Sequence, residues 1–155
     1  MSGGAGRALQ PDPATPGIAY RLGNDLDLDD FVELYRASTL AERRPAGDRE
    51  RMERMLAGSN LLVSAWDGAL AVGLARSITD RAYCTYLSDL AVRSSHQRRG
   101  IGAALIRATA REAGPDAPVH LLSAPGAVEF YEAIGLERFP AAFRVAAGRS
   151  EAPGR

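Results

Sequence analysis

Apolar residues at helical spacing predict two helices in the first part of the chain. The first follows Asp27, a residue type that caps helix N-termini, and the second follows Asp48 and ends at Gly58. A short strand over residues 18–22 is expected before them. The apolar faces of the two helices are Leu28, Phe31, Val32 and Tyr35 in the first, and Met52, Met55 and Leu56 in the second.

A different pattern, with apolar runs bounded by turn residues, predicts the strands of a sheet. Residues 61–66 and 70–78 flank Asp67-Gly68, a dipeptide that suits the positive φ angles of a tight turn, so these two strands should pair antiparallel. A third strand is expected over residues 83–92, where apolar and polar residues alternate before a polar loop at 94–99.

The remainder of the chain continues the alternation of helices and strands. A helix is expected from about residue 100 to residue 113, then a buried strand over 119–123 and a second helix that begins near Pro125 and ends at Gly135. Residues 136–145 predict one or two last strands, although a proline at position 140 interrupts any continuous ladder. The expected order is βααβββαβαβ, an α/β fold with a mixed, mostly antiparallel central sheet flanked by helices.

Size and composition fit one domain. The chain has 155 residues, with 19 basic and 19 acidic side chains, so no overall field favours nucleic acid or an anionic membrane as a partner. It has one cysteine, Cys84, and no apolar run at its beginning, which predicts a cytoplasmic protein. The Gly-, Ala- and Pro-rich residues 1–16 and residues 148–155 are expected to be disordered tails around a folded domain at 17–147.

The loop before the third helix has the chemistry of a phosphate site. A helix start exposes unpaired N–H groups with partial positive charge, and Gly100 and Gly102 let the main chain approach a ligand closely. Arg98 or Arg99 can add charge-assisted contacts. The same glycines also fit an ordinary helix start that packs closely. Leu105 replaces the third glycine of a dinucleotide fingerprint, and no P-loop lysine follows.

Two segments together resemble a known family. Leu90-Ala91-Val92 leading into Gln97-Arg98-Arg99-Gly100-Ile101-Gly102-Ala103 resembles the acetyl-CoA-binding motif of the GNAT superfamily of N-acetyltransferases. Phe130-Tyr131-Glu132-Ala133-Ile134-Gly135-Leu136 is similar to the F-Y-x-x-x-G-F segment near the end of those enzymes. The resemblance covers residues 17–145 and implies a single-domain GNAT-like fold.

The resemblance assigns roles to these residues. It implies that main-chain groups of Leu90, Ala91 and Val92 line up with the pantetheine arm of acetyl-CoA, and that Tyr131 protonates the departing thiolate. The pyrophosphate would be bound by Gln97, Arg98, Arg99, Gly100, Ile101, Gly102 and Ala103. The family often has an asparagine where this chain has Ala124, so Ser123 or the main chain is the candidate for that contact. The resemblance also suggests a homodimer.

Several candidate residues have a structural alternative. Asp89 could accept the proton of the acceptor ammonium directly or through water, or it could brace a neighbouring loop. Tyr131 also lies on the apolar side of its predicted helix and could be a core residue. His96 and His120 lack further ligands, so no metal is expected. Cys84 has no visible activating neighbour and is not expected to act as a nucleophile.

The expected activity is direct transfer of an acetyl group from acetyl-CoA to a primary amine in a ternary complex. The alternatives are a non-catalytic acyl-CoA-binding regulatory module, and an acyltransferase that uses another acyl group or an alcohol acceptor. If Arg43 or Arg44 faces the acceptor cleft, an acceptor with a carboxylate or phosphate would gain a counter-charge. Other candidates to line that cleft are Tyr35, Trp66, Tyr83 and Tyr86.

Overall fold

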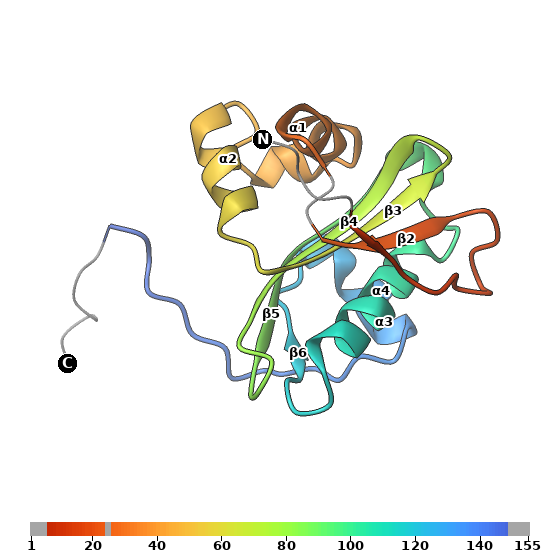
Figure 1. The fold of residues 1–155 in the computed structure, drawn as a ribbon. Helices are drawn as coiled ribbons and strands as arrows, with labels where there is room; N and C mark the ends of the chain where they lie inside the picture. Colours follow the sequence, from red (N-terminus) through yellow and green to blue (C-terminus); the bar gives the residue numbers. More distant parts are fainter. Residues whose placement is uncertain (1–5, 24–25, 149–155) are drawn as a thin grey trace, which may run out of the picture. The chain divides into compact units, whose positions relative to one another are not determined.

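A computed structural model of the chain describes residues 6–23 and 26–148 (Figure 1). These residues fall into two compact units, one up to residue 122 and the other from residue 123 onward. The first unit contains the sheet and three α-helices, and the second contains a short 3-10 turn and the α-helix that follows it.

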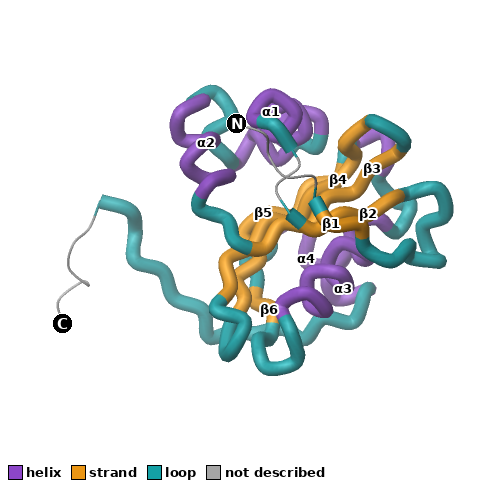
Figure 2. The backbone as a smooth tube through the Cα atoms, in the orientation of Figure 1, coloured by secondary structure: helices purple, strands orange, loops and turns teal. Residues whose placement is uncertain are grey.

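The first unit is built on a mixed, mostly antiparallel sheet, as the sequence predicts, and this sheet has six strands (Figure 2). The strands lie side by side in chain order, and every neighbouring pair is antiparallel except the last, which is parallel. The strands are β1 (Arg7–Ala8), β2 (Ala19–Leu22), β3 (Leu61–Asp67), β4 (Leu70–Thr79), β5 (Thr85–Val92) and β6 (Val119–His120).

The turn between β3 and β4 confirms the hairpin that the sequence predicts. Asp67 pairs with Leu70, and Gly68 between them has a φ of 58°, in the left-handed region that glycine adopts without strain. The pairing shifts between Ala65 and Trp66, where a bulge interrupts the regular ladder. The local turn chemistry thus fixes the two long central strands next to each other.

Helices cover both faces of this sheet (Figure 1). The helices α1 (Leu28–Ala37) and α2 (Arg49–Ala57) lie on one face, and α3 (Ile101–Ala113) lies on the other. The predicted caps of the first two are confirmed, because the side chain of Asp27 accepts from the N–H of Asp30 and that of Asp48 accepts from the N–H of Arg51. The 3-10 turns η1 (Leu40–Arg43) and η2 (Ser94–His96) lie in the connections.

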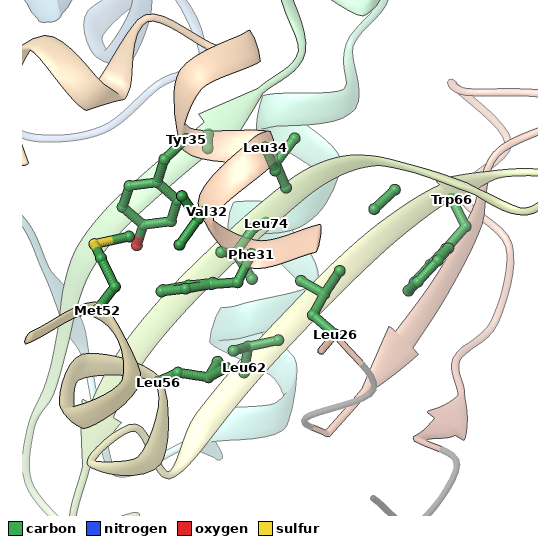
Figure 3. Packing of buried hydrophobic residues seen from close by; sticks show 12 residues of the cluster. Leu26, Phe31, Val32, Leu34, Tyr35, Met52, Leu56, Leu62, Trp66 and Leu74 are labelled. Carbon is green, nitrogen blue, oxygen red and sulfur yellow. The ribbon is translucent and has the colours of Figure 1, made fainter. Parts of the chain in front are cut away.

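The core between α1, α2 and the sheet is formed by large side chains (Figure 3). The rings of Phe31 and Tyr35, one turn apart on α1, lie 4.6 Å from centroid to centroid. They pack with Leu56 of α2 and with Leu62 and Leu74 of the sheet. Burial of each such side chain contributes about 1.5–3 kcal/mol. This packing holds the segment between α1 and α2 close to β4 and β5.

The second unit has less regular structure than the sequence predicts. It begins with η3 (Pro125–Ala127), in which Pro125 stands at the start, and continues with α4 (Val128–Ala133), which ends before Gly135 at a φ of 87°. The prediction of strands over residues 136–145 is wrong, because the structure contains no strand there. Pro140 cannot donate a ladder hydrogen bond, and no neighbouring strand pairs with this segment.

The N-terminal segment differs from its prediction in the opposite direction. Residues 1–5 and 149–155 of the two expected tails lie outside the described residues, but residues 6–16 pack on the first unit. Arg7 and Ala8 form β1 beside β2, and Thr15 is only 3% exposed, with its hydroxyl 2.9 Å from that of Tyr20. The observed order is therefore ββααβββαβα. None of the described helices is both long and apolar enough to cross a membrane.

Candidate functional site

One edge of β5 is largely without a partner strand. Its other edge pairs with β4 from Thr85 to Val92, whereas β6 pairs with it only at Thr85 and Tyr86. From Leu87 to Val92, no strand among the described residues covers this edge. An uncovered strand edge presents main-chain N–H and C=O groups that can bind an extended ligand. Leu90, Ala91 and Val92 lie on this part of the strand.

The uncovered edge leads into a loop with an unusual backbone. Arg98 and Gly100 both have positive φ angles, 59° and 81°, and residues 97–100 are exposed. The side-chain amide of Gln97 donates to the carbonyl oxygen of Val92 over 3.0 Å, which ties the loop to the end of β5. Left-handed residues re-aim successive N–H groups, and such turns form anion sites in proteins. The loop is thus shaped by its own main chain and side chains.

The first turn of α3 follows this loop directly. No side chain caps the helix at Gly100, and the first intrahelical hydrogen bond runs from the N–H of Ala104 to the carbonyl of Gly100 over 3.0 Å. The N–H groups of Ile101, Gly102 and Ala103 precede that bond, so they have no acceptor within the helix. Together with the positive end of the helix dipole, they can bind phosphate oxygens.

Two arginines add positive charge beside the helix start. Arg98 and Arg99 are exposed, and neither has an ion-pair partner among residues 6–23 and 26–148. An exposed guanidinium beside a set of main-chain N–H groups attracts an anion and can bind it in a bidentate manner. The loop and helix start can therefore hold a diphosphate.

Close packing fixes the position of α3 against the sheet. A Cβ atom at Gly73 of β4 would lie 3.0 Å from Cδ1 of Leu105 and 3.2 Å from Cγ2 of Ile101, both on α3. Only glycine allows the helix to approach the strand this closely. Because Ile101 belongs to the first turn, Gly73 sets the distance between β4 and the proposed phosphate site.

The connection from β5 to the loop is held by contacts with α1, on the face of the sheet opposite to α3. Arg93 forms a paired contact with the carboxylate of Glu33 on α1, in which its Nη1 lies 2.8 Å from Oε1, and it also donates to the carbonyl of Ala71. These hydrogen bonds hold the pKa of Glu33 below its usual range. The hydroxyl of Ser94 donates to the carbonyl of Ala37 over 2.8 Å. The end of β5 is thus held in place from α1.

Asp89 lies in the middle of a buried network rather than at an open surface. Asp89 is only 1% exposed. Its carboxylate accepts hydrogen bonds from Nε of Arg44 at 2.5 Å, from Nε of Arg76 at 2.5 Å and from the hydroxyl of Tyr35 at 2.6 Å. Burial and the charge of Asp89 raise the pKa of Tyr35, so its hydroxyl stays a donor. Burial lowers the pKa of Arg76, but Asp89 and Tyr35 together outweigh this effect, so that the pKa of Arg76 is raised.

These contacts favour the bracing role for Asp89 that the sequence left open. Both carboxylate oxygens already accept hydrogen bonds, Oδ1 from Arg44 and Oδ2 from Arg76. The network connects Asp89 on β5 to Tyr35 on α1, to Arg44 directly after η1, and to Arg76 on β4. The role of Asp89 as the base itself stays a prediction.

The network could have been partly anticipated from the sequence. Arg76 interrupts an otherwise apolar run in β4, and a charge within a buried strand requires a partner. Asp89 is the matching charge in the next strand, and the two residues are direct neighbours in the observed register. The contribution of Tyr35 gave no such signal, because its place on the apolar face of α1 is fully explained by packing.

The other candidates for the acceptor cleft differ in exposure. Tyr35 and Trp66 are buried, and the indole N–H of Trp66 donates to the hydroxyl of Ser64 over 2.8 Å. Tyr83 and Tyr86 are 80% and 40% exposed. Arg43 is exposed, whereas the half-buried Arg44 belongs to the network around Asp89.

Ser123 and Tyr131 both belong to the second unit. The hydroxyl of Ser123 donates to the carbonyl of Ala124 over 2.7 Å. Tyr131 lies on α4, where its ring meets that of Phe130 edge to face with centroids 5.1 Å apart. Burial raises the pKa of the Tyr131 hydroxyl above its ordinary value, which keeps it protonated at neutral pH. The roles of both residues stay predictions.

The histidines and the cysteine have no cluster of metal ligands around them. Nε2 of His96 lies 3.1 Å from a carboxylate oxygen of Asp67, and Cys84 is exposed. Within the described part of the chain, no group of three His, Cys, Asp or Glu residues could hold a metal ion.

Comparison with known proteins shows to which family the chain belongs. Residues 36–148 match the family described as acetyltransferase (GNAT) domain. The chain belongs to the GNAT acetyltransferase family. This confirms the resemblance seen in the sequence, and it makes the protein a member of a family of transferases. Among curated protein sequences, none matches this chain.

Solved structures agree with the GNAT fold. A GNAT-family acetyltransferase from Streptococcus pneumoniae TIGR4 is 25% identical, with a TM-score of 0.65 over 85% of this chain and 98% of its own. An acetyltransferase from Trypanosoma brucei is 21% identical, with a TM-score of 0.58 over 83% and 99%. An aminoglycoside acetyltransferase from an uncultured soil metagenomic sample, in complex with sisomicin, is 22% identical, with a TM-score of 0.63 over 84% and 96%.

Proposed function

We propose that this GNAT protein transfers an acetyl group from acetyl-CoA to a primary amine by direct attack in a ternary complex. One observation carries the proposal: the uncovered edge of β5 leads, through the connection at 93–100, to the uncapped start of α3. The first feature suits an extended amide-containing arm, and the second suits a diphosphate. Coenzyme A consists of these two parts in this order.

The direction of the strand orients the proposed cofactor. A pyrophosphate bound by residues 97–103 lies beyond the end of β5. The pantetheine arm then runs back along Val92, Ala91 and Leu90, so that the thioester comes next to Ser88 and Asp89. Acetyl transfer would therefore take place beside the network formed by Asp89 and Arg44.

The chemistry needs one nucleophile and one acid. The neutral amine attacks the thioester carbonyl carbon and forms a C–N bond, and collapse of the tetrahedral species breaks the C–S bond. The departing thiolate takes a proton from the hydroxyl of Tyr131, and the ammonium proton leaves to water. We favour water over Asp89 as the immediate base, because both oxygens of Asp89 are already engaged.

Calorimetry and turnover test the proposal in sequence. The protein is titrated with coenzyme A, and acetyl-CoA is then supplied with a panel of amines while coenzyme A release is followed. Binding and turnover support the proposal, and no binding to the folded protein would reject it. Binding without turnover on any amine would favour a regulatory acyl-CoA-binding module. The product mass identifies the acyl group and separates amine from alcohol acceptors.

Tyr131→Phe tests the acid. The substitution removes one hydroxyl and keeps the ring, including its contact with Phe130. Loss of a general acid is expected to lower kcat about 100-fold or more, with little change in the affinity for coenzyme A. Phe130→Leu serves as a packing control, because it perturbs the same helix without removing a proton donor. An unchanged kcat of Tyr131→Phe across the pH range would remove Tyr131 from the mechanism.

A further inference from the structure

Two arginines share a single carboxylate in the first unit. Arg44, Arg76, Asp89 and Tyr35 form a cluster, called here the Asp89 cluster, in which each of the other three side chains donates a hydrogen bond to the carboxylate of Asp89. Tyr35 is a neutral donor in this cluster. With two guanidiniums and one carboxylate, the Asp89 cluster carries one positive charge in excess.

Arg76 is buried and its hydrogen bonds stabilise the fold. Its side chain is 8% exposed, and besides Asp89 it donates to the hydroxyls of Ser59 and Ser88 and to the carbonyl of Met55 in the last turns of α2. The carbonyl end of that helix adds a partial negative charge that favours a cation at this position. Arg76 therefore has local compensation from Asp89 and from α2.

Arg44 uses only some of its hydrogen-bond donors within the described part of the protein. Its side chain is 28% exposed, and it donates through Nε to Asp89, through Nη1 to the carbonyl of Arg43 and through Nη2 to the carbonyl of Ser88, the last two over 2.9 Å. A guanidinium has five N–H donors. The described part of the chain therefore provides acceptors for three of them, and the outer part of Arg44 can still bind an anion.

The position of Arg44 relates it to the proposed reaction. Its Nη2 contacts the main chain of Ser88, which lies two residues before Leu90 on β5. Because the thioester is proposed to lie beside Ser88 and Asp89, an anion on the outer part of Arg44 would lie within a small molecule's length of the reacting carbonyl.

We infer that the acceptor amine carries a carboxylate and that Arg44 binds this carboxylate. This inference rests on the proposed function and adds a substrate class to it, that of free amino acids and related amino acids with a short spacer. The fixed plane of the Arg44 guanidinium suits a planar carboxylate, and the excess charge of the Asp89 cluster favours an anionic group over a neutral one. Arg43, although adjacent, has no such fixed geometry.

Matched pairs of acceptors test this inference. Acetylation of the twenty free L-amino acids and of β-alanine is compared with that of the corresponding carboxamides, and phosphoethanolamine is included as an amine with a different anion. At neutral pH, the less basic amine of the carboxamide is more often in the neutral form that can attack, so a preference for the free acid cannot arise from amine ionisation. We expect kcat/KM to be about 10- to 100-fold higher for the preferred free acid than for its carboxamide.

Two variants locate the effect at Arg44. Arg44→Ala should bring the acid-to-carboxamide ratio close to one through a higher KM for the acid, while Arg44→Lys should keep part of the ratio. Asp89 keeps its contact with Arg76 in both variants, so both are expected to fold. Arg51→Ala, which removes an exposed positive charge from α2, should leave the ratio unchanged.

The outcomes separate this inference from the proposed function. If the wild-type protein binds coenzyme A but acetylates carboxamides as well as acids, acetylates no carboxylated amine, or prefers phosphoethanolamine, the inference is wrong and the family chemistry stands. The same conclusion follows if Arg44→Ala keeps the ratio of the wild-type protein. If coenzyme A does not bind at all, the proposed function fails and this inference fails with it.

Discussion

At the scale of residues, Asp89 accepts hydrogen bonds from two charged side chains and one neutral one. In an open cleft, a carboxylate could shuttle a proton, but this one is enclosed by two guanidiniums and a tyrosine hydroxyl. Removing the charge of Asp89 would leave two arginines next to each other with no counter-charge between them. The first effect of such a change should therefore be on the stability of the fold.

Asp89→Asn tests whether Asp89 stabilises the fold or acts as the base in the reaction. We expect the free energy of unfolding to fall by about 3–5 kcal/mol, because a buried charge pair loses one partner. Urea unfolding of the variant measures this effect. Asp29→Asn is the matched control, since Asp29 pairs with Arg49 on the surface and should contribute no more than about 1 kcal/mol.

The opposite result would support the alternative role. If Asp89→Asn unfolds at the same urea concentration as the wild-type protein while kcat falls strongly, Asp89 acts in proton transfer. Sequence reasoning identified Asp89 as important but could not choose between the two roles, because Arg44 and Arg76 are distant from it along the chain. Only the fold brings all three side chains together.

At the scale of elements, α3 packs closely against β4 next to the site. Gly73 has no side chain, and the atoms that a Cβ would meet belong to Leu105, Ile101 and Ala65, all of them buried. Neither the β-branched Ile101 nor the methyl group of Ala65 can move aside easily. A larger side chain at Gly73, within the sheet, can therefore shift the start of α3.

Gly73→Val should disturb the proposed cofactor site without touching it. Overpacking at this contact is expected to cost about 2–3 kcal/mol of unfolding free energy and to weaken coenzyme A binding, because the first turn of α3 moves. Unfolding and calorimetry measure the two effects. Gly47→Val is the control, since a Cβ at Gly47 meets nothing within 4 Å. Unchanged coenzyme A affinity in a destabilised Gly73→Val protein would separate α3 from ligand binding.

The elements with local signals were predicted well. Asp27 and Asp48 cap their helices as expected, and Gly68 forms the hairpin turn, because each of these effects involves only neighbouring residues. Strand pairing depends on distant partners, and here prediction failed. Residues 136–145 have an apolar pattern but no strand beside them, whereas Arg7 and Ala8 form a strand because β2 provides an edge.

At the scale of the whole molecule, the N-terminal segment connects distant parts of the first unit. Its main chain pairs with β2, and the N–H of Leu9 donates to the carbonyl of Tyr20 over 2.8 Å. Its side chains reach α3, where Arg7 pairs with Glu112 and Asp12 with Arg107. Composition alone predicted a tail, because a segment rich in Gly, Ala and Pro can still be ordered by a few specific contacts.

Deletion of residues 1–16 tests this connection. Loss of the main-chain pairing and of the buried Thr15 should lower the free energy of unfolding by about 2 kcal/mol, roughly 4–8 °C in Tm for a chain of this size. Thermal unfolding followed by circular dichroism measures the change. The double variant Arg7→Ala and Arg107→Ala removes these two ion pairs and should cost less than about 1 kcal/mol per pair. A deletion that leaves Tm unchanged would restore the prediction of a tail.

The uncovered edge of β5 has a consequence for how this protein can evolve. A ligand that is bound by main-chain groups does not depend on which side chains the strand carries. Substitutions along β5 are then limited by packing in the core and by contacts with the substrate. Substitution of surface residues can then change the acceptor while the main-chain contacts with the cofactor stay the same. Such a division of labour would let one scaffold diversify its chemistry of recognition while its sequence drifts far from that of its relatives.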